Sequence, residues 1–360
     1  MKIVITGGGG FVGSHAVRYF AAEGHEVTAI DSFCREEILG RHFLGPQVAR
    51  YNWNGFSRLR GVRRIEQDVR SQKAMDALLK DADAVIHTAA QVAVTTSVVD
   101  PRTDFDINVD GTVNVLEAAR KSRSSPAIVF CSTNKVYGNR VNDIPVRAHG
   151  PRYEFDDPSF ATGIPERFGV DLVHHTPYGA SKLAADLYLQ EYAHSYGLPT
   201  AVFRMSCIYG PRQFGMEDQG WVAHFALSAF FDRPVTIYGD GKQVRDVLYV
   251  DDLIRAYATY LERSRQLGGR VYNIGGGPSF TMSLLELLSQ LEENLGRKLR
   301  VSYEDWRPAD QRVYVTDISK VRSELGWSPS VGPAEGVRRI LAWLENSKFH
   351  LPRTRNKTPA

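Results

Sequence analysis

Tyr178 and Lys182 stand four residues apart in the segment Thr176–Lys182, and on a helix two residues at this spacing lie on the same face. A tyrosine phenol has an ordinary pKa of about 10, which makes it a poor base at neutral pH, but a nearby cation favours the phenolate. The pair is therefore suited to taking a proton from a hydroxyl group and returning it. Tyrosine and lysine are both common on helix surfaces, so the spacing alone is a weak signal.

A glycine-rich turn near the start of the chain gives the pair a context. It follows the apolar run Lys2–Thr6 and contains both G-x-G-x-x-G and G-x-x-G-x-x-G spacing, in the residues Gly7, Gly8, Gly9, Gly10, Phe11, Val12 and Gly13. Without side chains the turn can tighten, and its backbone can approach a pyrophosphate whose charge is favoured by the N-terminus of the next helix. The turn therefore predicts a dinucleotide site.

Carboxylates end the second and third apolar runs. Asp31 stands where a carboxylate accepts the hydroxyls of an adenosine ribose and repels a 2′-phosphate, which favours NAD over NADP. Arg35 is the opposite signal and leaves NADP as the alternative. Asp68 is either a turn residue or an adenine contact, and its place at a strand end favours the contact. Small residues end the fourth apolar run, just before Gln91. Small side chains at this place would either let a cofactor lie close to the backbone or allow tight packing.

Thr133 follows the fifth apolar run, at the edge of the sheet where open α/β folds bind ligands. Its hydroxyl can hydrogen-bond a reacting hydroxyl and share that proton with Tyr178. Threonine at a strand end is more often a turn former, so this role depends on Tyr178 and Lys182 being close by.

A definite set of elements must position these residues. Apolar runs predict strands at 2–6, 25–31, 62–68, 84–88, 127–132 and 200–205, and helical patterns lie near 11–23, 73–79, 103–122 and 177–196. This alternation implies an α/β fold, a Rossmann-type doubly wound parallel sheet covered on both faces. The last helix has clear ends, because Thr176 can cap it, Pro177 suits its first position and Gly197 stops it.

Beyond residue 205 the alternation loosens. We expect residues 1–205 to form the NAD-binding domain, with 235–260 packing back onto it, and residues 206–350 to form a smaller C-terminal α/β substrate lobe. Ser283–Glu286 is a capping box that opens a helix ending at Gly296, another helix lies near 334–346, and 351–360 should be a flexible tail. The insertion 33–60, rich in arginine and aromatic residues, is either a basic lid or an ordinary surface excursion.

The composition of the chain argues against several classes of protein. The 360 residues, 43% of them hydrophobic, can bury a large core, and a net charge of +3 gives no bulk case for binding nucleic acid or an anionic membrane. No apolar stretch is long enough to span a bilayer and no signal-peptide pattern is present. Cys34, Cys131 and Cys207 lack metal-ligand spacing, so we expect no metal site and a reducing compartment, the cytoplasm by default.

The whole motif set resembles a known family. Thr6–Gly13, Asp31, Thr133, Tyr178 and Lys182, with Tyr209–Arg212 and Arg245–Val247, are similar to the extended short-chain dehydrogenase/reductase family of nucleotide-sugar enzymes, over nearly the whole chain. Segments 91–97, 132–138, 218–222 and 241–246 resemble the branch that epimerises carbon 2 of CDP-linked sugars. The resemblance implies tightly bound NAD, oxidation of a CDP-hexose or CDP-dideoxyhexose to a ketone at that carbon, and hydride return to the opposite face.

The resemblance also implies residue roles. Tyr178 would be the base, Lys182 would tune it and hold the nicotinamide ribose, and Thr133 would polarise the hydroxyl. The implied cofactor contacts are Gly7, Gly10, Phe11, Val12, Gly13, Asp31, Ser32, Asp68, Val69, Ala89, Ala90, Gln91, Asn108, Tyr178 and Lys182. The implied substrate contacts are Thr95, Thr133, Asn134, Cys207, Thr236, Tyr238, Arg245 and Arg312, the two arginines gripping the pyrophosphate. Helices 103–122 and 177–196 resemble the pair that forms a four-helix homodimer interface.

Three other functions are weighed against this one. A 4-epimerase on the same scaffold needs no further residue and stays open. A 4,6-dehydratase needs a carboxylic acid and a carboxylate beside the catalytic threonine, where this chain has Asn134 and Lys135, which argues against elimination. A non-catalytic dinucleotide-binding protein would have lost part of the set Thr133, Tyr178 and Lys182, and all three are intact.

Overall fold

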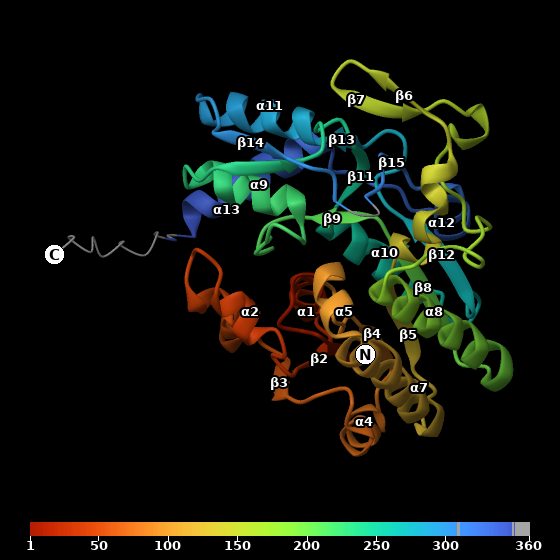
Figure 1. The fold of residues 1–360 in the computed structure, drawn as a ribbon. Coiled ribbons are helices and arrows are strands. Elements are labelled where there is room, and N and C mark those ends of the chain that lie inside the picture. The colour runs from red at the N-terminus through yellow and green to blue at the C-terminus, as the bar shows by residue number, and fades with distance from the viewer. Residues whose placement is uncertain (308–309, 348, 350–360) are drawn as a thin grey trace.

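A seven-stranded parallel sheet forms the centre of the computed structural model, which describes residues 1–307, 310–347 and 349, with only the backbone described at 37 and 38. The strand order is β12-β8-β5-β4-β1-β2-β3 (Figure 1). The strands are β1 (Lys2–Thr6), β2 (Glu26–Asp31), β3 (Val62–Glu66), β4 (Ala84–His87), β5 (Ala127–Thr133), β8 (Thr200–Met205) and β12 (Arg270–Ile274). The order reverses between β1 and β4, so a ligand crevice is expected at the carboxyl ends of these two strands.

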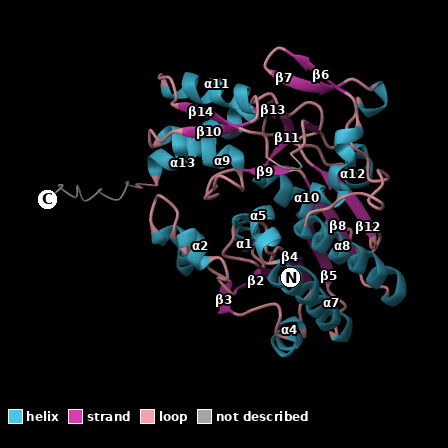
Figure 2. Ribbon diagram, in the orientation of Figure 1, coloured by secondary structure: helices cyan, strands magenta, loops and turns pink. Residues whose placement is uncertain are grey.

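Helices cover both faces of the sheet (Figure 2), because its strands are apolar on both sides. Ile3 and Ile5 pack on one face with α1 (Phe11–Ala22), α10 (Val250–Glu262) and α12 (Ser319–Leu325). Val4, between them, packs on the other face with α4 (Gln72–Leu79), α7 (Gly111–Lys121) and α8 (Pro177–Tyr196). The predicted α/β doubly wound architecture is confirmed.

Helix α8 begins and ends as its sequence predicts. The Thr176 hydroxyl accepts a hydrogen bond of 3.2 Å from the Gly179 amide, and Pro177 takes the first helical position. Gly197 ends the helix with a φ of +68°, in the left-handed region that favours glycine. The helix therefore carries Tyr178 and Lys182 in its first two turns.

The helix predicted at 103–122 is longer and irregular. It is preceded by α5 (Val94–Val99) and consists of α6 (Pro101–Phe105), the π-helical stretch η3 (Asp106–Asp110) and α7. Within it, the Thr112 hydroxyl donates to the carbonyl of Asn108 at 2.6 Å. A π-helical stretch inside a helix often marks a functional region, and this one lies against α8.

Two segments beyond residue 205 return to the central sheet. Strand β12 pairs in parallel with β8, although the predicted division placed residues 270–274 in the substrate lobe. Its buried Tyr272 and Ile274 belong to the core of the first domain, which explains this pairing. Of the segment 235–260, α10 packs against α1, whereas β10 (Val235–Tyr238) and β11 (Val244–Tyr249) belong to the smaller sheets.

The second lobe contains these smaller sheets. Strand β10 pairs with β14 (Val301–Glu304), and β11 pairs with β9 (Cys207–Tyr209), β13 (Thr281–Ser283) and β15 (Val313–Tyr314). The lobe's helices are α9 (Trp221–Phe230), α11 (Leu284–Leu295) and α13 (Pro333–Asn346), and the predicted capping box of Ser283 and Glu286 opens α11. The hairpin of β6 (Val146–His149) and β7 (Arg152–Phe155) lies between the 3-10 segments η4 (Asn134–Asp143) and η5 (Pro158–Phe160). The predicted tail 351–360 lies outside the described residues.

The insertion 33–60 connects the two lobes. It contains α2 (Glu36–Gly40), η1 (Pro46–Val48), α3 (Tyr51–Asn54) and η2 (Gly55–Arg58). Its Leu44 and Val48 are buried in the core of the second lobe, whereas Trp53 and Phe56 are buried in the core of the first. The insertion is therefore a packed part of both lobes rather than an ordinary surface excursion. None of the helices in the described part of the chain is long and apolar enough to cross a membrane.

Candidate active site

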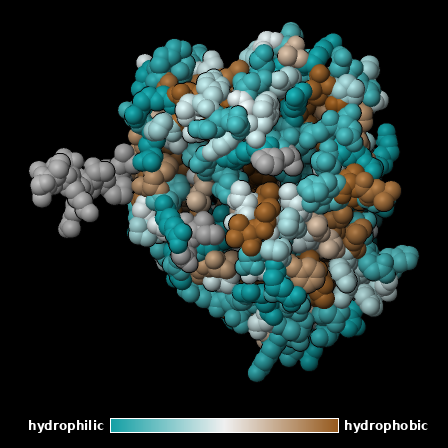
Figure 3. All heavy atoms as spheres, viewed as in Figure 1, coloured by the Kyte–Doolittle hydropathy of each residue, from teal (hydrophilic) through white to brown (hydrophobic). Residues whose placement is uncertain are grey.

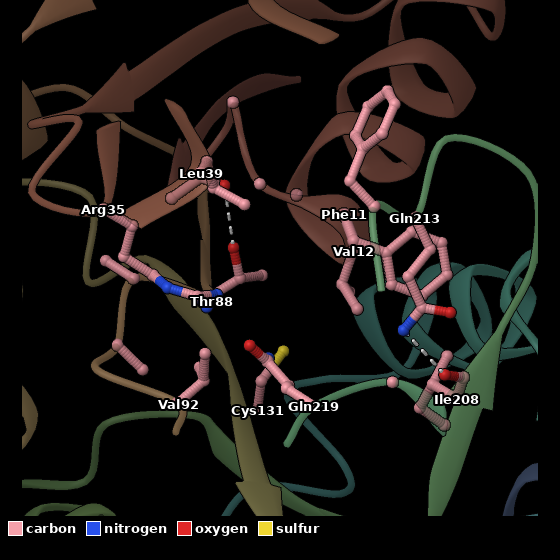
Figure 4. Close-up of a pocket in the computed structure, with 18 of the residues that line it drawn as sticks. Phe11, Val12, Arg35, Leu39, Thr88, Val92, Cys131, Ile208, Gln213 and Gln219 are labelled. Atoms are coloured by element: carbon pink, nitrogen blue, oxygen red, sulfur yellow. Dashed lines mark hydrogen bonds between the residues drawn. The ribbon is translucent and has the colours of Figure 1, made fainter. Parts of the chain in front are cut away.

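A cavity of about 440 Å³ opens where the carboxyl edge of the sheet faces the second lobe. Its wall combines the glycine turn, the ends of β2, β4 and β5, the start of α8, part of the insertion and the loop 212–222. Figure 4 shows Arg35 and Thr88 on one side of this space, and Val12 beside Gln213 and Ile208 of the second lobe on the other. The cavity lies at the position expected from the strand order.

The glycine turn leaves no room for side chains. A β-carbon added at Gly13 would lie 2.2 Å from the Gly7 carbonyl oxygen, and one added at Gly7 would lie 2.7 Å from the Ala89 amide nitrogen. Gly7 also has a φ of +67°, which side chains rarely adopt. The turn therefore presents bare backbone to the cavity at the start of α1, and this cradle fits the pyrophosphate of a dinucleotide.

Asp31 lies at the end of β2, in the cavity wall. Its two carboxylate oxygens accept hydrogen bonds of 2.9 Å from the amides of Gly9 and Phe33. Burial raises the pKa of Asp31, and these two amides lower it. Because an ionised carboxylate can accept further hydrogen bonds, Asp31 fits the ribose hydroxyls of an adenosine.

The proton-transfer pair is assembled as predicted. Thr133 at the end of β5 and Tyr178 at the start of α8 both line the cavity. Burial raises the pKa of Tyr178 to about 12, while the nearby Thr133 hydroxyl and the charge of Arg35 lower it. The arrangement places a phenol and a hydroxyl side by side in a cavity, which is what proton exchange with a substrate hydroxyl requires.

Lys182 lies one turn further along α8, and its side chain is only 2% exposed. Its ammonium stands 4.0 Å from the centre of the Phe130 ring, a cation–π contact. Burial lowers the pKa of Lys182 to about 8, and the nearby Cys131, Asp186 and Asp104 act in the opposite direction. The predicted tuning of Tyr178 by Lys182 stays a prediction.

A buried ion pair holds the catalytic helix against the sheet. Asp186, one turn beyond Lys182, accepts hydrogen bonds from Arg204 on β8 at 2.9 and 3.2 Å. It also accepts one of 2.9 Å from Ser132, the residue before Thr133. One carboxylate therefore connects the strand that carries Thr133 to the helix that carries Tyr178.

The predicted cofactor contacts fall into two groups. Most of them line the cavity: Gly7, Gly10, Phe11, Val12, Gly13, Asp31, Ser32, Asp68, Val69, Ala89, Ala90, Tyr178 and Lys182. Gln91 and Asn108 do not belong to its wall. They are buried behind it, where the Asn108 amide donates to Ser181 on α8 at 3.0 Å and the Gln91 amide donates to Asp104 at 2.8 Å. Their contacts support the helix.

The predicted substrate contacts are also divided. Thr133, Asn134 and Cys207 line the cavity, whereas Thr95, Thr236, Tyr238, Arg245 and Arg312 do not. Thr95 donates to Asp218, which is in the wall. Tyr238 stacks under the Arg307 guanidinium at 4.0 Å, and Arg245 donates to Asp310 at 2.8 Å. Thr95 lies on α5 of the first domain, and the other four residues lie in the second lobe beyond the cavity wall.

Sequence reasoning missed several wall residues. Arg35 lines the cavity from the insertion, and its Nε atom is buried without a hydrogen-bond partner. Lys135 lines it two residues after Thr133. Arg35 was visible as a basic residue four positions after Asp31, and Lys135 as an unusual cation beside the threonine. The described residues contain no group of three or more histidine, cysteine or carboxylate side chains able to hold a metal ion.

Comparisons with known proteins identify relatives of this chain. The family model for the NAD dependent epimerase/dehydratase family matches residues 3–275. The CDP-paratose 2-epimerase of Salmonella typhi is 38% identical over 354 residues, which cover 96% of this chain and 100% of that protein.

Two solved structures share the fold. The UDP-glucose 4-epimerase of Thermus thermophilus, in complex with NAD, is 31% identical with a TM-score of 0.76, covering 96% of this chain and 100% of that one. The UDP-glucuronic acid 4-epimerase of Bacillus cereus, in complex with UDP-glucuronic acid and NAD, is 27% identical with a TM-score of 0.78 and the same coverage. The chain therefore belongs to the NAD dependent epimerase/dehydratase family, and it is an epimerase whose cofactor is NAD.

Proposed function

We propose that this protein is a nucleotide-sugar epimerase that inverts carbon 2 of a CDP-linked hexose or dideoxyhexose. The observation that carries the reaction type is the placement of the Thr133 hydroxyl and the Tyr178 phenol in the wall of one cavity, which begins at the glycine turn. The choice of carbon 2 and of CDP is supported by the 38% identity to the CDP-paratose 2-epimerase of Salmonella typhi over its whole length.

The chain's own residues divide the work. Thr133 holds the sugar hydroxyl, Tyr178 accepts its proton as the carbon becomes a ketone, and both act in reverse after the sugar has turned its other face. Lys182 keeps a positive charge beside the phenol and holds the nicotinamide ribose. NAD, which we propose is held tightly by the glycine turn, Asp31 and Lys182, would supply the acceptor and then the donor of the hydride at the reacting carbon.

Elimination finds no support in this site. The two positions after Thr133 are Asn134 and Lys135, both in the cavity wall, and neither is a carboxylic acid. A 4,6-dehydratase would need such an acid to expel water. The remaining rival is a 4-epimerase, which would use the same Thr133 and Tyr178 on a differently seated sugar.

The test uses the holoprotein with CDP-paratose, followed by proton NMR. Substrate deuterated at carbon 2 should turn over more slowly than substrate deuterated at carbon 4, because only the bond at the reacting carbon is broken. The product should keep its deuterium. An isotope effect at carbon 4 instead would establish a 4-epimerase, and no turnover with any CDP-, GDP-, UDP- or dTDP-sugar would sink the proposal.

We further propose a homodimer through α8 and the helical segment 101–121. Large hydrophobic side chains are exposed on these helices and on α5, namely Val98, Val99, Phe105, Leu187, Tyr188 and Tyr196. Figure 3 shows hydrophobic patches where these helices lie in Figure 1, and such patches favour a partner surface. Light scattering should give twice the chain mass, and Leu187→Glu should give the single mass. A monomeric wild type at micromolar concentration would remove this proposal.

The three free cysteines support a cytoplasmic location.

A further inference from the structure

Lys135 connects the proton-transfer pair to the second lobe. Its backbone amide donates to the Thr133 hydroxyl oxygen at 3.2 Å, so it belongs to the same turn as the catalytic threonine. Its side chain lines the cavity and reaches Gln311, whose side-chain oxygen lies 3.4 Å from the ammonium nitrogen. That contact is long for a charged donor, and it is the single polar contact shown for the ammonium within the described residues.

The surroundings of Lys135 hold an excess of positive charge. Burial lowers the pKa of Lys135, the nearby charge of Arg245 lowers it as well, and Asp310 acts in the opposite direction. Arg245 already donates to Asp310 at 2.8 Å, and only 11% of its side chain is exposed. Asp310 is therefore already paired with Arg245, and no ion pair between Lys135 and a carboxylate is found among the described residues. An unpaired charge in such a place is costly, and an anionic ligand would offset the cost.

The closeness of Lys135 to Thr133 can be compared with the geometry of a nucleotide sugar. In a nucleotide sugar, carbon 2 is bonded to carbon 1, which carries the diphosphate, whereas carbon 4 lies across the ring. A cation two residues from Thr133 can reach the sugar-linked phosphate when the hydroxyl held by Thr133 is on carbon 2. A hydroxyl on carbon 4 would place that phosphate on the far side of the sugar.

We infer that Lys135 binds the sugar-linked phosphate of the substrate and thereby selects carbon 2 over carbon 4. This inference rests on the proposed function and adds a specificity-determining residue to it. Arg245 lies outside the cavity wall and is paired with Asp310, which leaves Lys135 as the cation that faces the substrate. Thr133 and Lys135 together then accept only a substrate in which the reacting hydroxyl is close to the sugar-linked phosphate.

The first experiment measures binding by calorimetry, with CDP and CMP as the probes. Lys135→Met keeps the length of the side chain and removes its charge, so CDP affinity should fall about 10- to 100-fold, the range for a lost hydrogen bond to a charged group. CMP lacks the second phosphate, so its affinity should be unchanged. Lys135→Arg should recover most of the CDP affinity. Lys298→Met, which changes a lysine whose side chain is 90% exposed, is the matched control and should bind both as the wild type does.

The second experiment measures the reacting carbon with the deuterated substrates described above. For inversion at carbon 2, Lys135→Met should raise KM by a larger factor than it lowers kcat. The ratio of turnover at carbon 2 to turnover at carbon 4 should also be smaller than in the wild type. Circular dichroism and NAD binding establish that the variant folds. An unchanged CDP affinity in Lys135→Met, or an equal loss of affinity for CMP, would overturn the inference about Lys135. If the wild type still inverts carbon 2, the proposed function stays intact in that case. A wild type that does not bind CDP would instead refute the proposed function.

Discussion

Replacing Asp186 by asparagine tests how strongly the catalytic helix depends on one buried carboxylate. Asp186 is fully buried and 6% of the Arg204 side chain is exposed, so the charge of Arg204 has no access to bulk water. In Asp186→Asn the new amide would turn a donor toward the guanidinium and leave that charge uncompensated. Removing one partner of such a pair costs about 3–5 kcal/mol, a large part of a typical stability of about 5–15 kcal/mol.

Urea unfolding followed by tryptophan fluorescence measures this cost. With an m-value of about 3 kcal/mol/M, the transition midpoint should fall by about 1 M or more. At urea concentrations below the unfolding transition, the turnover of the variant should also be lower than that of the wild type, because the Ser132 hydroxyl loses its charged acceptor next to Thr133. The matched control is Glu335→Gln, which breaks exposed ion pairs on α13 and should cost less than about 1 kcal/mol.

The double variant Asp186→Leu with Arg204→Met separates charge from packing. It removes both charges, and well-packed apolar replacements of a buried pair are often neutral. We therefore expect it to be more stable than Asp186→Asn alone. A double variant as unstable as the sum of the two single variants, or an Asp186→Asn protein with the wild-type midpoint, would refute the reasoning.

Four further predictions follow from the site. Tyr178→Phe should bind NAD normally and lose at least about 100-fold in turnover measured by NMR, since general base help is worth that much; near-normal turnover would reject Tyr178 as the base. Burial in the folded protein lowers the pKa of Lys182 to about 8 from its ordinary value of 10.5. The buried ammonium therefore destabilises the folded state fully below pH 8, and this destabilisation disappears as the pH rises toward 10.5. Relative to Lys182→Met, wild-type stability in urea should therefore rise by about 2 kcal/mol between pH 7 and 9.5, and a constant difference would contradict this. Asp31→Ala should weaken NAD binding in calorimetry by about tenfold or more, through lost charged hydrogen bonds, and unchanged binding would exclude a ribose contact. Gly13→Ala should abolish NAD-induced thermal stabilisation, because its β-carbon would meet the Gly7 carbonyl at 2.2 Å, and a normal shift in melting temperature would argue against the cradle.

Some parts of the site could be predicted because their causes are local. The ends of α8 depend on Thr176, Pro177 and Gly197, each of which acts on backbone groups within four residues. The glycine turn and Asp31 follow their strands directly, so the position of each strand places them in the cavity wall. Period-2 alternation placed Ile3 and Val4 on opposite faces of the sheet in the same way.

Other parts could not be predicted because their partners are distant in the sequence. Strand β12 joins the sheet across a parallel pairing with β8, which no local pattern near residue 270 specifies. The insertion contributes Arg35 to the cavity, and its Leu44 and Val48 are buried in the second lobe, far from it in sequence. The π-helical stretch in the predicted helix 103–122 likewise accompanies buried contacts of Asn108 with α8.

The amino-acid sequence by itself determined the chemical groups and their local geometry: a phenol and an ammonium one turn apart, a threonine at a strand end and a bare glycine turn. Tertiary structure alone decided which groups meet. Lys135 reaches Gln311 across 176 positions of the chain, and Asp186 reaches Arg204 and Ser132 from a different element. The physical reason is that hydrogen bonds and burial act over a few ångströms in space, whatever the separation in sequence, so the surroundings of each charge exist only once the two lobes have packed together.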